Sequence, residues 1–216
     1  MRIILIRHGQ STGNTERRFQ GQSKDPRFHL TALGKQQAHK LKQRFIDENV
    51  APTHIYSSPL KRVKETAEII ANHTNIEIQY KDDLQEYDLG ILTGMSIDAA
   101  SEKYEKSEWQ QLQLSEFETV EGAETIQEKL IRANQVINWV IAKHNDEDTI
   151  FLVCHGGFLQ DIVTSILQTP KRWRISIKNT AIFDFSINLD EWKKEKLLLT
   201  NRFWEINSFN DYSHLL

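Results

Sequence analysis

Two short apolar segments, each followed closely by a histidine, stand out along the chain. Residues 3–6 read Ile-Ile-Leu-Ile, and residues 149–154 read Thr-Ile-Phe-Leu-Val-Cys. Apolar runs of this length are typical of strands buried on both faces, as in the middle of a parallel sheet. His8 and His155 lie at the carboxyl ends of these two runs. Because ligands bind outside the carboxyl ends of the strands in open α/β sheets, both histidines occupy candidate positions for chemistry.

The rest of the pattern predicts helices that alternate with further strands. Apolar residues at a three-to-four spacing indicate helices, and short apolar or alternating runs indicate strands. Helices are expected from Thr31, from Pro59, over 123–144 and over 158–167, weak helices over 95–120, and strands at 54–57, 76–80, 180–187 and 196–204, with a hairpin through 188–190 joining the last two. This alternation predicts an α/β fold, a three-layer α/β/α sandwich around a mainly parallel central sheet.

We expect a single domain over residues 1–216, because the length suits one core and no repeat, low-complexity segment or long linker interrupts it. Residues 87–122 do not fit the alternation, and we interpret them as an inserted cap over the active site. Apolar residues of this segment are expected to pack under the cap rather than line the site. They are Tyr104, Trp109, Leu112, Leu114 and Phe117.

Charge and composition narrow the choice of partner. The formal net charge is −3, which gives no general argument for nucleic acid or an anionic membrane as partner. The one cysteine, Cys154, excludes an internal disulfide and a cysteine-rich zinc site. No cluster has metal-ligand spacing, so no metal and no cofactor are expected. The first strand leaves no room for a signal peptide and is too short to span a membrane, so we expect a cytoplasmic protein.

The residues around the first strand end are suited to phosphate chemistry. A neutral histidine, here His8, can attack phosphorus through a ring nitrogen, and the planar fork of Arg7 fits phosphate oxygens two at a time. Ser11 or Thr12 can cap a short helix, which would place Asn14 one turn in as an amide donor. The sequence therefore predicts an anion-binding strand end.

The starts of two more expected helices also favour the binding of an anion. Arg62 falls in the first turn of an expected helix, where the helix dipole disfavours a cation and an anion would compensate. The amides of Gly156 and Gly157 begin another helix and are a natural anion site. In the loop that crosses the pocket rim, Arg17, Arg18, Lys24 and Arg27 could touch an anionic substrate, although each is expected to be a solvated loop charge.

Five motifs in order resemble the histidine phosphatase superfamily (branch 1), whose members are also called phosphoglycerate mutase-like. The resemblance covers almost the whole chain. It rests on residues 5–11 (Leu-Ile-Arg-His-Gly-Gln-Ser) with Asn14, on 17–21 with 30–34, on 57–67 (Ser-Ser-Pro-Leu-Lys-Arg-Val-Lys-Glu-Thr-Ala), on Leu84-Gln85-Glu86 with Gly90 and Gly94, and on 153–157 (Val-Cys-His-Gly-Gly); residues 210–215 also look like the usual tail.

The resemblance implies a role for each matching residue in a metal-independent phosphoric monoester hydrolase. His8 would be the nucleophile that becomes a phosphohistidine, and Glu86 the acid that protonates the leaving oxygen and then activates water. Arg7, Arg62 and His155, the last as an imidazolium, would hold the phosphoryl oxygens. Asn14 and Gly156 complete the predicted phosphate-binding set. Three residues differ from those usual in the family. Gln22 and Ala123 are expected at the rim of the pocket and Cys154 in the packing of the strand, so the resemblance does not identify the substrate.

Four functions remain open at this point. The first is a phosphomonoesterase that hydrolyses a small phosphorylated metabolite. The second is a cofactor-dependent phosphoglycerate mutase, whose family members carry a longer insertion than the 69 positions (155 − 86) between Glu86 and His155. The third is a catalytically silent phosphate-binding module, and the fourth a nucleotide-binding α/β protein, for which no glycine fingerprint is present. The sequence names neither the phosphate ester nor the oligomeric state, and it leaves a homodimer open.

Overall fold

The computed structural model describes residues 1–169, 171–172, 174–192 and 204–216. Within them, six strands form one sheet in the order β3-β2-β4-β1-β5-β6. The strands are β1 (Arg2–Arg7), β2 (His54–Ser57), β3 (Ile78–Tyr80), β4 (Thr149–Cys154), β5 (Ile182–Ile187) and β6 (Trp204–Asp211). Three neighbouring pairs are parallel, and β5 runs antiparallel to both β1 and β6. The expected mainly parallel sheet is confirmed.

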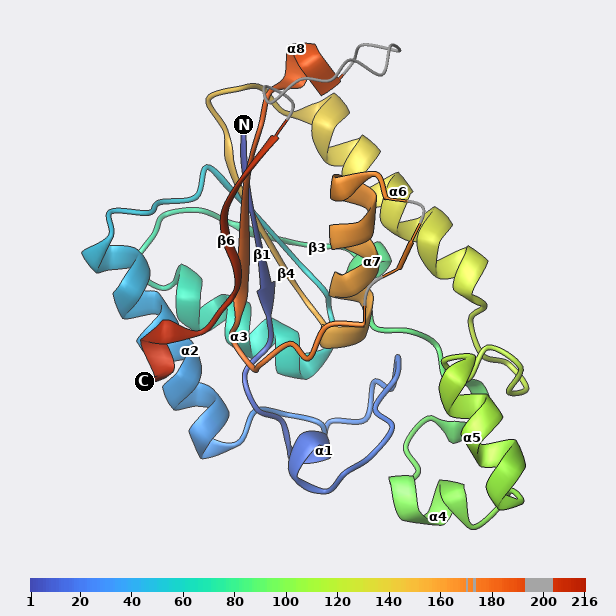
Figure 1. The fold of residues 1–216 in the computed structure, drawn as a ribbon. Helices are drawn as coiled ribbons and strands as arrows, with labels where there is room; N and C mark the ends of the chain where they lie inside the picture. The colour runs from blue at the N-terminus through green and yellow to red at the C-terminus, as the bar shows by residue number, and fades with distance from the viewer. Residues whose placement is uncertain (170, 173, 193–203) are drawn as a thin grey trace.

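Helices cover both faces of the sheet and complete the three layers. Figure 1 shows α2 (Ala32–Asp47) and α3 (Lys61–Ala71) on one face, and α6 (Ile126–Lys143) and α7 (Gly156–Leu167) on the other. Because successive side chains of a strand point to opposite faces, Ile4 and Ile6 enter the core under α2 and α3. Ile3 and Leu5 enter the core under α6 and α7. The apolar run of β1 is therefore buried on both sides, as its sequence predicts.

Capping residues explain where the main helices begin. Thr31 accepts from the Gly34 amide at the start of α2, and Thr125 forms a capping box with Glu128 at the start of α6. Two expected starts were wrong by two residues. Pro59 precedes α3, since Leu60 is still extended at the N-cap position, and α7 already begins at Gly156.

The C-terminal region agrees with the expected arrangement at β5 and differs from it after residue 187. The predicted strand over 196–204 lies outside the described residues except for Trp204, and the structure places β6 at Trp204–Asp211. The expected hairpin at 188–190 is replaced by the start of α8 (Leu189–Trp192). β6 is an edge strand with mostly exposed or half-buried residues, so it lacks the apolar pattern that identifies a buried strand.

Residues from the proposed cap gather around a small hydrophobic cluster of their own. It joins Leu92, Leu112 and Val120 to partly buried aromatic side chains. The segment contains the 3-10 turn η2 (Gly90–Leu92) and the helices α4 (Ile97–Ser101) and α5 (Lys106–Leu114). Another 3-10 turn, η1 (Asp82–Leu84), precedes it. Tyr104, Trp109 and Leu112 pack as expected, whereas Leu114 is 72% exposed. The division into one domain with a cap at 87–122 stays a prediction.

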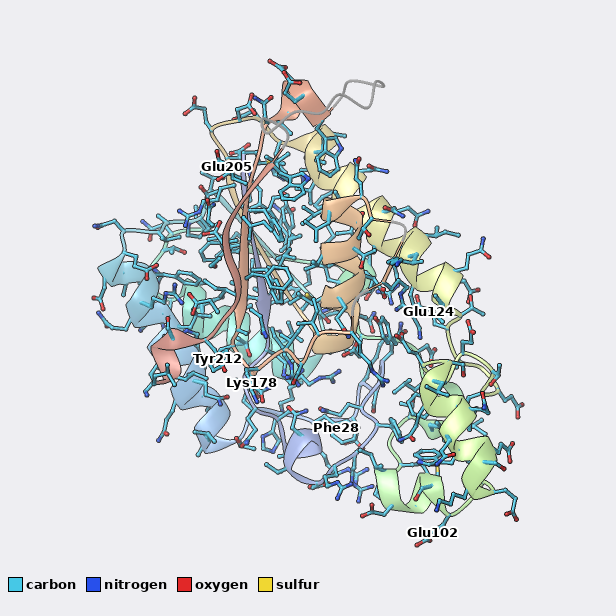
Figure 2. All side chains as sticks on the ribbon, in the orientation of Figure 1. Phe28, Glu102, Glu124, Lys178, Glu205 and Tyr212 are labelled. Atoms are coloured by element: carbon cyan, nitrogen blue, oxygen red, sulfur yellow. The ribbon has the colours of Figure 1, made fainter. Side chains whose placement is uncertain are left out.

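The cap and α1 (Thr12–Thr15) lie beyond the carboxyl end of β1 (Figure 1). The side-chain view places Phe28 and Lys178 at this end of the molecule and Glu205 at the opposite end (Figure 2). A last 3-10 turn, η3 (Ser213–Leu215), follows β6 beside α2. None of the helices in the described part of the chain has the length and apolar character needed to cross a bilayer.

Candidate active site

A pocket of about 270 Å³ lies at the carboxyl ends of the central strands. Its lining includes residues that the sequence singles out, namely Arg7, His8, Asn14, Arg62 and Glu86. The cap segment contributes Tyr87, Leu89, Glu116 and Phe117, and the first turns of α7 contribute Gly157 and Gln160. The structure thus brings together side chains from five separated stretches of the chain.

The His8 ring is held in the form that a nucleophile requires. His8 is 3% exposed, and its Nδ1 lies 2.7 Å from the carbonyl oxygen of Gly9. A carbonyl can only accept, so Nδ1 carries the proton and Nε2 is left with its lone pair. Burial, followed by the charges of Arg62 and Arg7, lowers the pKa of His8 well below its ordinary 6.5. The ring is therefore neutral and oriented for attack through Nε2.

His155 lies behind His8, with 5.3 Å between the ring centroids. Arg62 Nη2 donates to His155 Nδ1 at 3.0 Å, so the proton is on Nε2, which donates to Ser58 Oγ at 2.9 Å. Burial and the charge of Arg62 lower the pKa of His155 well below 6.5. Instead of the expected imidazolium, the structure gives a neutral ring whose two nitrogens both have protein partners. In this arrangement His155 orients Arg62.

Two guanidinium groups provide donors that no atom of the described residues uses. Arg62 is 1% exposed, and Arg62 Nε and Nη1 are buried without a partner among the described residues. Arg7 Nη1 donates to the Ile177 carbonyl, while Arg7 Nε is buried and has no partner there. Buried polar groups are nearly always hydrogen-bonded, so unpaired guanidinium donors at a pocket mark a site for an anion.

Burial disfavours the charged forms of both Arg7 and Arg62. It lowers the pKa of Arg62 to about 10, with Glu86 opposing and Arg7 adding to the effect. It also lowers the pKa of Arg7, against the attraction of Glu86. Both groups remain charged at neutral pH, and a phosphoryl dianion would relieve their repulsion.

Glu86 is fixed by the first turn of α7. Its Oε2 accepts from the Gly157 amide at 3.1 Å, and its Oε1 accepts from the Phe158 amide at 2.9 Å and from the Tyr87 amide at 3.1 Å. The amide of Gly157, which was expected to be part of an anion site, is thus occupied by a carboxylate of the protein, as is the amide of Phe158. Gln22 donates to the Glu86 carbonyl at 3.0 Å and helps to hold the backbone.

Gly156 and Gly157 are needed at the start of α7 for clearance. A Cβ at position 156 would lie 2.9 Å from Arg7 Nε, and a Cβ at position 157 would lie 2.5 Å from Glu86 Oε1. Neither side chain could then stay where it is. Gly156 and His155 were both predicted as phosphate ligands, and both roles stay predictions. The residues that line the pocket include Gly157 but neither of these two.

Asn14 is oriented with its amide nitrogen available. Ser11 donates to Asn14 Oδ1 from its backbone nitrogen at 3.1 Å and from its hydroxyl at 3.0 Å. Because the oxygen is occupied, Nδ2 is the donor left for the pocket. Asn179, which the sequence analysis missed, donates to the His8 carbonyl at 3.1 Å and lies 3.4 Å from Asn14 Oδ1. Ser58, which contacts His155, was not predicted either, although it stands in the motif at 57–67.

A buried polar network joins the cap to α7 beside the pocket. The Tyr87 hydroxyl lies 2.6 Å from Asp161 Oδ2, and burial raises the pKa of Tyr87 well above 10. Arg172 donates to Asp161 at 2.8 Å and to Glu116 at 2.8 Å. No motif marks these residues, and only the fold shows that the cap residue Glu116 is tied to the body of the protein.

Of the four loop cations considered from sequence, Arg18 is the one that lines the pocket. It also contacts Glu16 at 2.7 Å and the Gly94 carbonyl at 3.0 Å. Arg17 pairs with Asp98 and Arg27 with Asp25, away from the lining. Arg174, which the sequence did not indicate, adds an exposed cation to the pocket. Cys154 is fully buried, and burial raises the pKa of its thiol, in agreement with a packing role.

The comparisons with known proteins agree with one another on the family. The model of the histidine phosphatase superfamily (branch 1) matches residues 3–200. Proteins named "Probable phosphoglycerate mutase GpmB" from Salmonella paratyphi C (strain RKS4594) and Salmonella choleraesuis (strain SC-B67) are each 32% identical over 218 residues, which covers 100% of this chain and 95% of the relative.

Solved structures share the fold. A phosphoserine phosphatase mutant from Entamoeba histolytica, in complex with phosphoserine, superposes with a TM-score of 0.75 at 24% identity, covering 100% of this chain and 99% of that one. A putative alpha-ribazole-5'-P phosphatase from Escherichia coli reaches a TM-score of 0.80 at 19% identity, covering 98% of each chain. At these identities the likeness establishes the architecture.

Proposed function

Because the chain belongs to the histidine phosphatase superfamily (branch 1), we propose that it is a phosphomonoesterase for a small phosphorylated metabolite. One observation carries the proposal: a neutral His8 lines the same pocket as Arg7 and Arg62, which have three buried guanidinium nitrogens without a partner among the described residues. Positioning and charge stabilisation make up most of the catalysis of phosphoryl transfer, and this arrangement offers both.

In the first step, His8 Nε2 attacks phosphorus and the bond to the leaving oxygen breaks. Glu86, entering as the carboxylic acid, gives its proton to that oxygen. The phosphorylated ring keeps its Nδ1 proton, so it becomes positively charged, and the Gly9 carbonyl stabilises it. Arg7 and Arg62 neutralise the charge on the transferring oxygens. General acid catalysis of this kind is worth about 100- to 10,000-fold.

In the second step, water attacks phosphorus on the phosphohistidine. Glu86, now the carboxylate, takes the proton of that water, and the phosphorus–nitrogen bond breaks. His8 returns to the neutral form with its proton still on Nδ1, and inorganic phosphate leaves. The hydrogen bonds from the α7 amides keep Glu86 in one place through both steps.

The pocket favours a small substrate that carries negative charge beyond the phosphoryl group. Its volume of about 270 Å³ is slightly below what is usual for ligand pockets. Arg18 and Arg174 are among its lining residues, together with the apolar side chains of Leu89 and Phe117. We include residues 87–122 in the proposal as the cap, since Tyr87, Leu89, Glu116 and Phe117 supply one wall.

Phosphoglycerate mutase is the second candidate, because the 32% identical relatives are named as such. A mutase would share the first step with a phosphatase. It would then return the phosphoryl group to another hydroxyl of the substrate before water reaches it. The short stretch between Glu86 and His155 favours the phosphatase.

The deciding experiment is a panel of phosphate esters scored by kcat/KM, with phosphoglycerate isomerisation measured alongside. The panel contains phosphoserine, phosphoglycerates, sugar phosphates, nucleoside phosphates and α-ribazole phosphate. Release of inorganic phosphate without isomerisation supports the proposal. Isomerisation that outruns hydrolysis makes the protein a mutase, and binding of phosphate without turnover makes it a silent module.

The role of His8 is tested with His8→Ala and an aryl phosphate. We expect hydrolysis to be abolished while circular dichroism and the melting temperature stay close to those of the unmodified protein. His39→Ala, which removes an exposed histidine of α2, is the matched control and should keep full activity. Turnover that survives in His8→Ala would remove the phosphohistidine from the mechanism.

A further inference from the structure

A second group of potential ligands lies at the other end of the sheet. His54 begins β2, His144 ends α6 at the C-cap position, and Asp148 lies in the turn before β4. Asp148 Oδ1 is 3.5 Å from His54 Nδ1, and Asp148 Oδ2 is 3.4 Å from His144 Nδ1. One ligand atom from each of the three lies within 4.8 Å of the others. Their side chains come from three separate places in the sequence, so no local spacing reveals the group.

The separations fit ligands around an ion better than direct hydrogen bonds. An N–H···O hydrogen bond has a donor–acceptor distance of about 2.7–3.2 Å. Nitrogen and oxygen ligands of zinc lie about 2.0–2.2 Å from the metal, so two corners of a tetrahedron are roughly 3.3–3.5 Å apart. Both nitrogen–oxygen distances fall in that range, each to a different carboxylate oxygen of Asp148.

Outer hydrogen bonds orient two of the three ligands. His144 Nε2 lies 3.0 Å from the Tyr56 hydroxyl in a buried contact, which leaves Nδ1 directed at the cluster. Asp148 Oδ2 accepts from the Asn145 amide at 3.0 Å, and Asp148 Oδ1 accepts from the Thr53 hydroxyl at 2.9 Å. Partners of this kind fix the rotamers of metal ligands in known sites.

We propose that His54, His144 and Asp148 bind a divalent first-row transition metal ion, with Zn²⁺ as the representative. Imidazole and carboxylate together suit this class, whereas Mg²⁺ and Ca²⁺ prefer sites made of oxygen alone. Three protein ligands leave the fourth position to water. The ion would tie the end of α6 to the starts of β2 and β4.

The ion would take no part in the phosphatase reaction. His54 is at the amino end of β2, and Ser58, which contacts His155, follows its carboxyl end. The four residues of β2 separate the two places by roughly 13 Å at about 3.3 Å per residue. The proposal is thus independent of the proposed function.

Two neighbouring residues, Lys143 and Thr53, affect the affinity of the cluster for the ion. Lys143 Nζ lies 5.0 Å from the ring centroid of Trp139 and 5.3 Å from that of Tyr56, so its charge is directed at ring faces. Thr53 Oγ1 is 2.9 Å from both His54 Nδ1 and Asp148 Oδ1. That hydroxyl could bridge the two side chains without any ion, which is the alternative that the experiment has to exclude.

The test is titration of the full-length, EDTA-treated and dialysed protein with Zn²⁺ by calorimetry, and with Co²⁺ by visible absorption. We expect one ion per chain and the intense absorption bands of tetrahedral Co²⁺. His54→Ala and Asp148→Asn should each weaken binding at least tenfold. His39→Ala, at an exposed position on α2, should leave binding unchanged, and so should His8→Ala, which removes a potential ligand in the pocket.

Two results would overturn the proposal. One is the absence of binding to the unmodified protein at micromolar Zn²⁺, which would leave the hydroxyl-bridged cluster. The other is binding that survives in His54→Ala and disappears in His8→Ala, which would place the ion in the pocket. If Asp148→Asn fails to fold, His54→Ala carries the test, since His54 is half-buried at a strand start. The melting temperature should rise with Zn²⁺ in the unmodified protein and not in His54→Ala.

Discussion

Replacing Arg62 by methionine separates what this buried charge costs the fold from what it contributes to catalysis. The side chain is 1% exposed, and its Nη2 donates to the Gly21 carbonyl and to His155 Nδ1, each at 3.0 Å. Nε and Nη1 have no partner among the described residues. One side of the guanidinium group is thus bound by the fold, and the other side has donors free for a ligand of the pocket that Arg62 lines.

The cost to stability follows from the pKa. Burial lowers the pKa of Arg62 from its ordinary value to about 10, which corresponds to roughly 3 kcal/mol against the charged form in the folded state. The folded-state pKa lies below the unfolded one, so this penalty is fully present below pH 10 and disappears only once the pH exceeds the unfolded-state pKa. Methionine removes the penalty and loses two hydrogen bonds, each worth about 1.5–3 kcal/mol. We expect the free energy of unfolding to fall by at most about 3 kcal/mol.

The effect on catalysis should be much larger. Loss of a single donor aimed at the charge of a transition state costs about 100- to 1,000-fold in rate. Arg62→Met removes two such donors and one positive charge. We expect kcat/KM for an aryl phosphate to fall by at least about 1,000-fold. Inorganic phosphate should raise the melting temperature of the unmodified protein and leave that of the variant unchanged.

Arg62→Lys is the matched control, because it keeps the charge and loses the planar fork. It should regain part of the phosphate-induced stabilisation without regaining kcat. The reasoning fails if Arg62→Met still hydrolyses the ester at a near-normal rate. It also fails if the variant loses more than about 5 kcal/mol of unfolding free energy yet is still stabilised by phosphate, since Arg62 would then be a structural residue.

Three further predictions concern the acid, the pH dependence and the metal. Glu86→Gln should slow the hydrolysis of esters with poor leaving groups far more than that of activated aryl phosphates, and equal losses on both would contradict its role as acid. Because burial and two arginines lower the pKa of His8, its neutral form persists in acid, and the acidic limb of kcat/KM should lie well below pH 6.5. A limb at or above pH 6.5, after correction for substrate ionisation, would mean that His8 is not the titrating group. Treatment with EDTA should leave kcat unchanged, because guanidinium groups hold the phosphoryl oxygens; a loss of kcat that added Zn²⁺ restores would count against this.

The central strands of the sheet could be predicted because strands buried on both faces consist almost entirely of apolar residues. β1 and β4 contact neighbours on both faces, so nearly every residue in them is apolar, and the runs at 3–6 and 149–154 show it. β6 could not be found in this way. It lies at the sheet edge with mostly exposed or half-buried side chains, and its polar residues resemble those of a loop.

The candidate site was predictable where one motif carries several groups, and not where contacts join distant segments. Arg7, His8 and Asn14 are close in sequence, and the structure places all three in one pocket. Asn179 reaches the His8 carbonyl from a segment with no motif, so only the fold reveals it. His54 and Asp148 meet for the same reason, since the sheet aligns the starts of β2 and β4.

The start of α7 shows that local sequence can predict an anion-binding helix end without identifying the anion. Its amides do bind an anion, as the exposed donors of a helix N-terminus favour. The anion is the carboxylate of Glu86, which arrives from a loop about 70 residues earlier in the chain and accepts from Gly157 and Phe158. In the proposed mechanism the phosphoryl group is held by side chains, and Arg7 and Arg62 have donors for it that lack a partner among the described residues. The same mechanism places the acid at the helix end and the phosphoryl oxygens at the guanidinium groups, so the α7 amides hold the proton donor in place while the two cations balance the negative charge of the substrate.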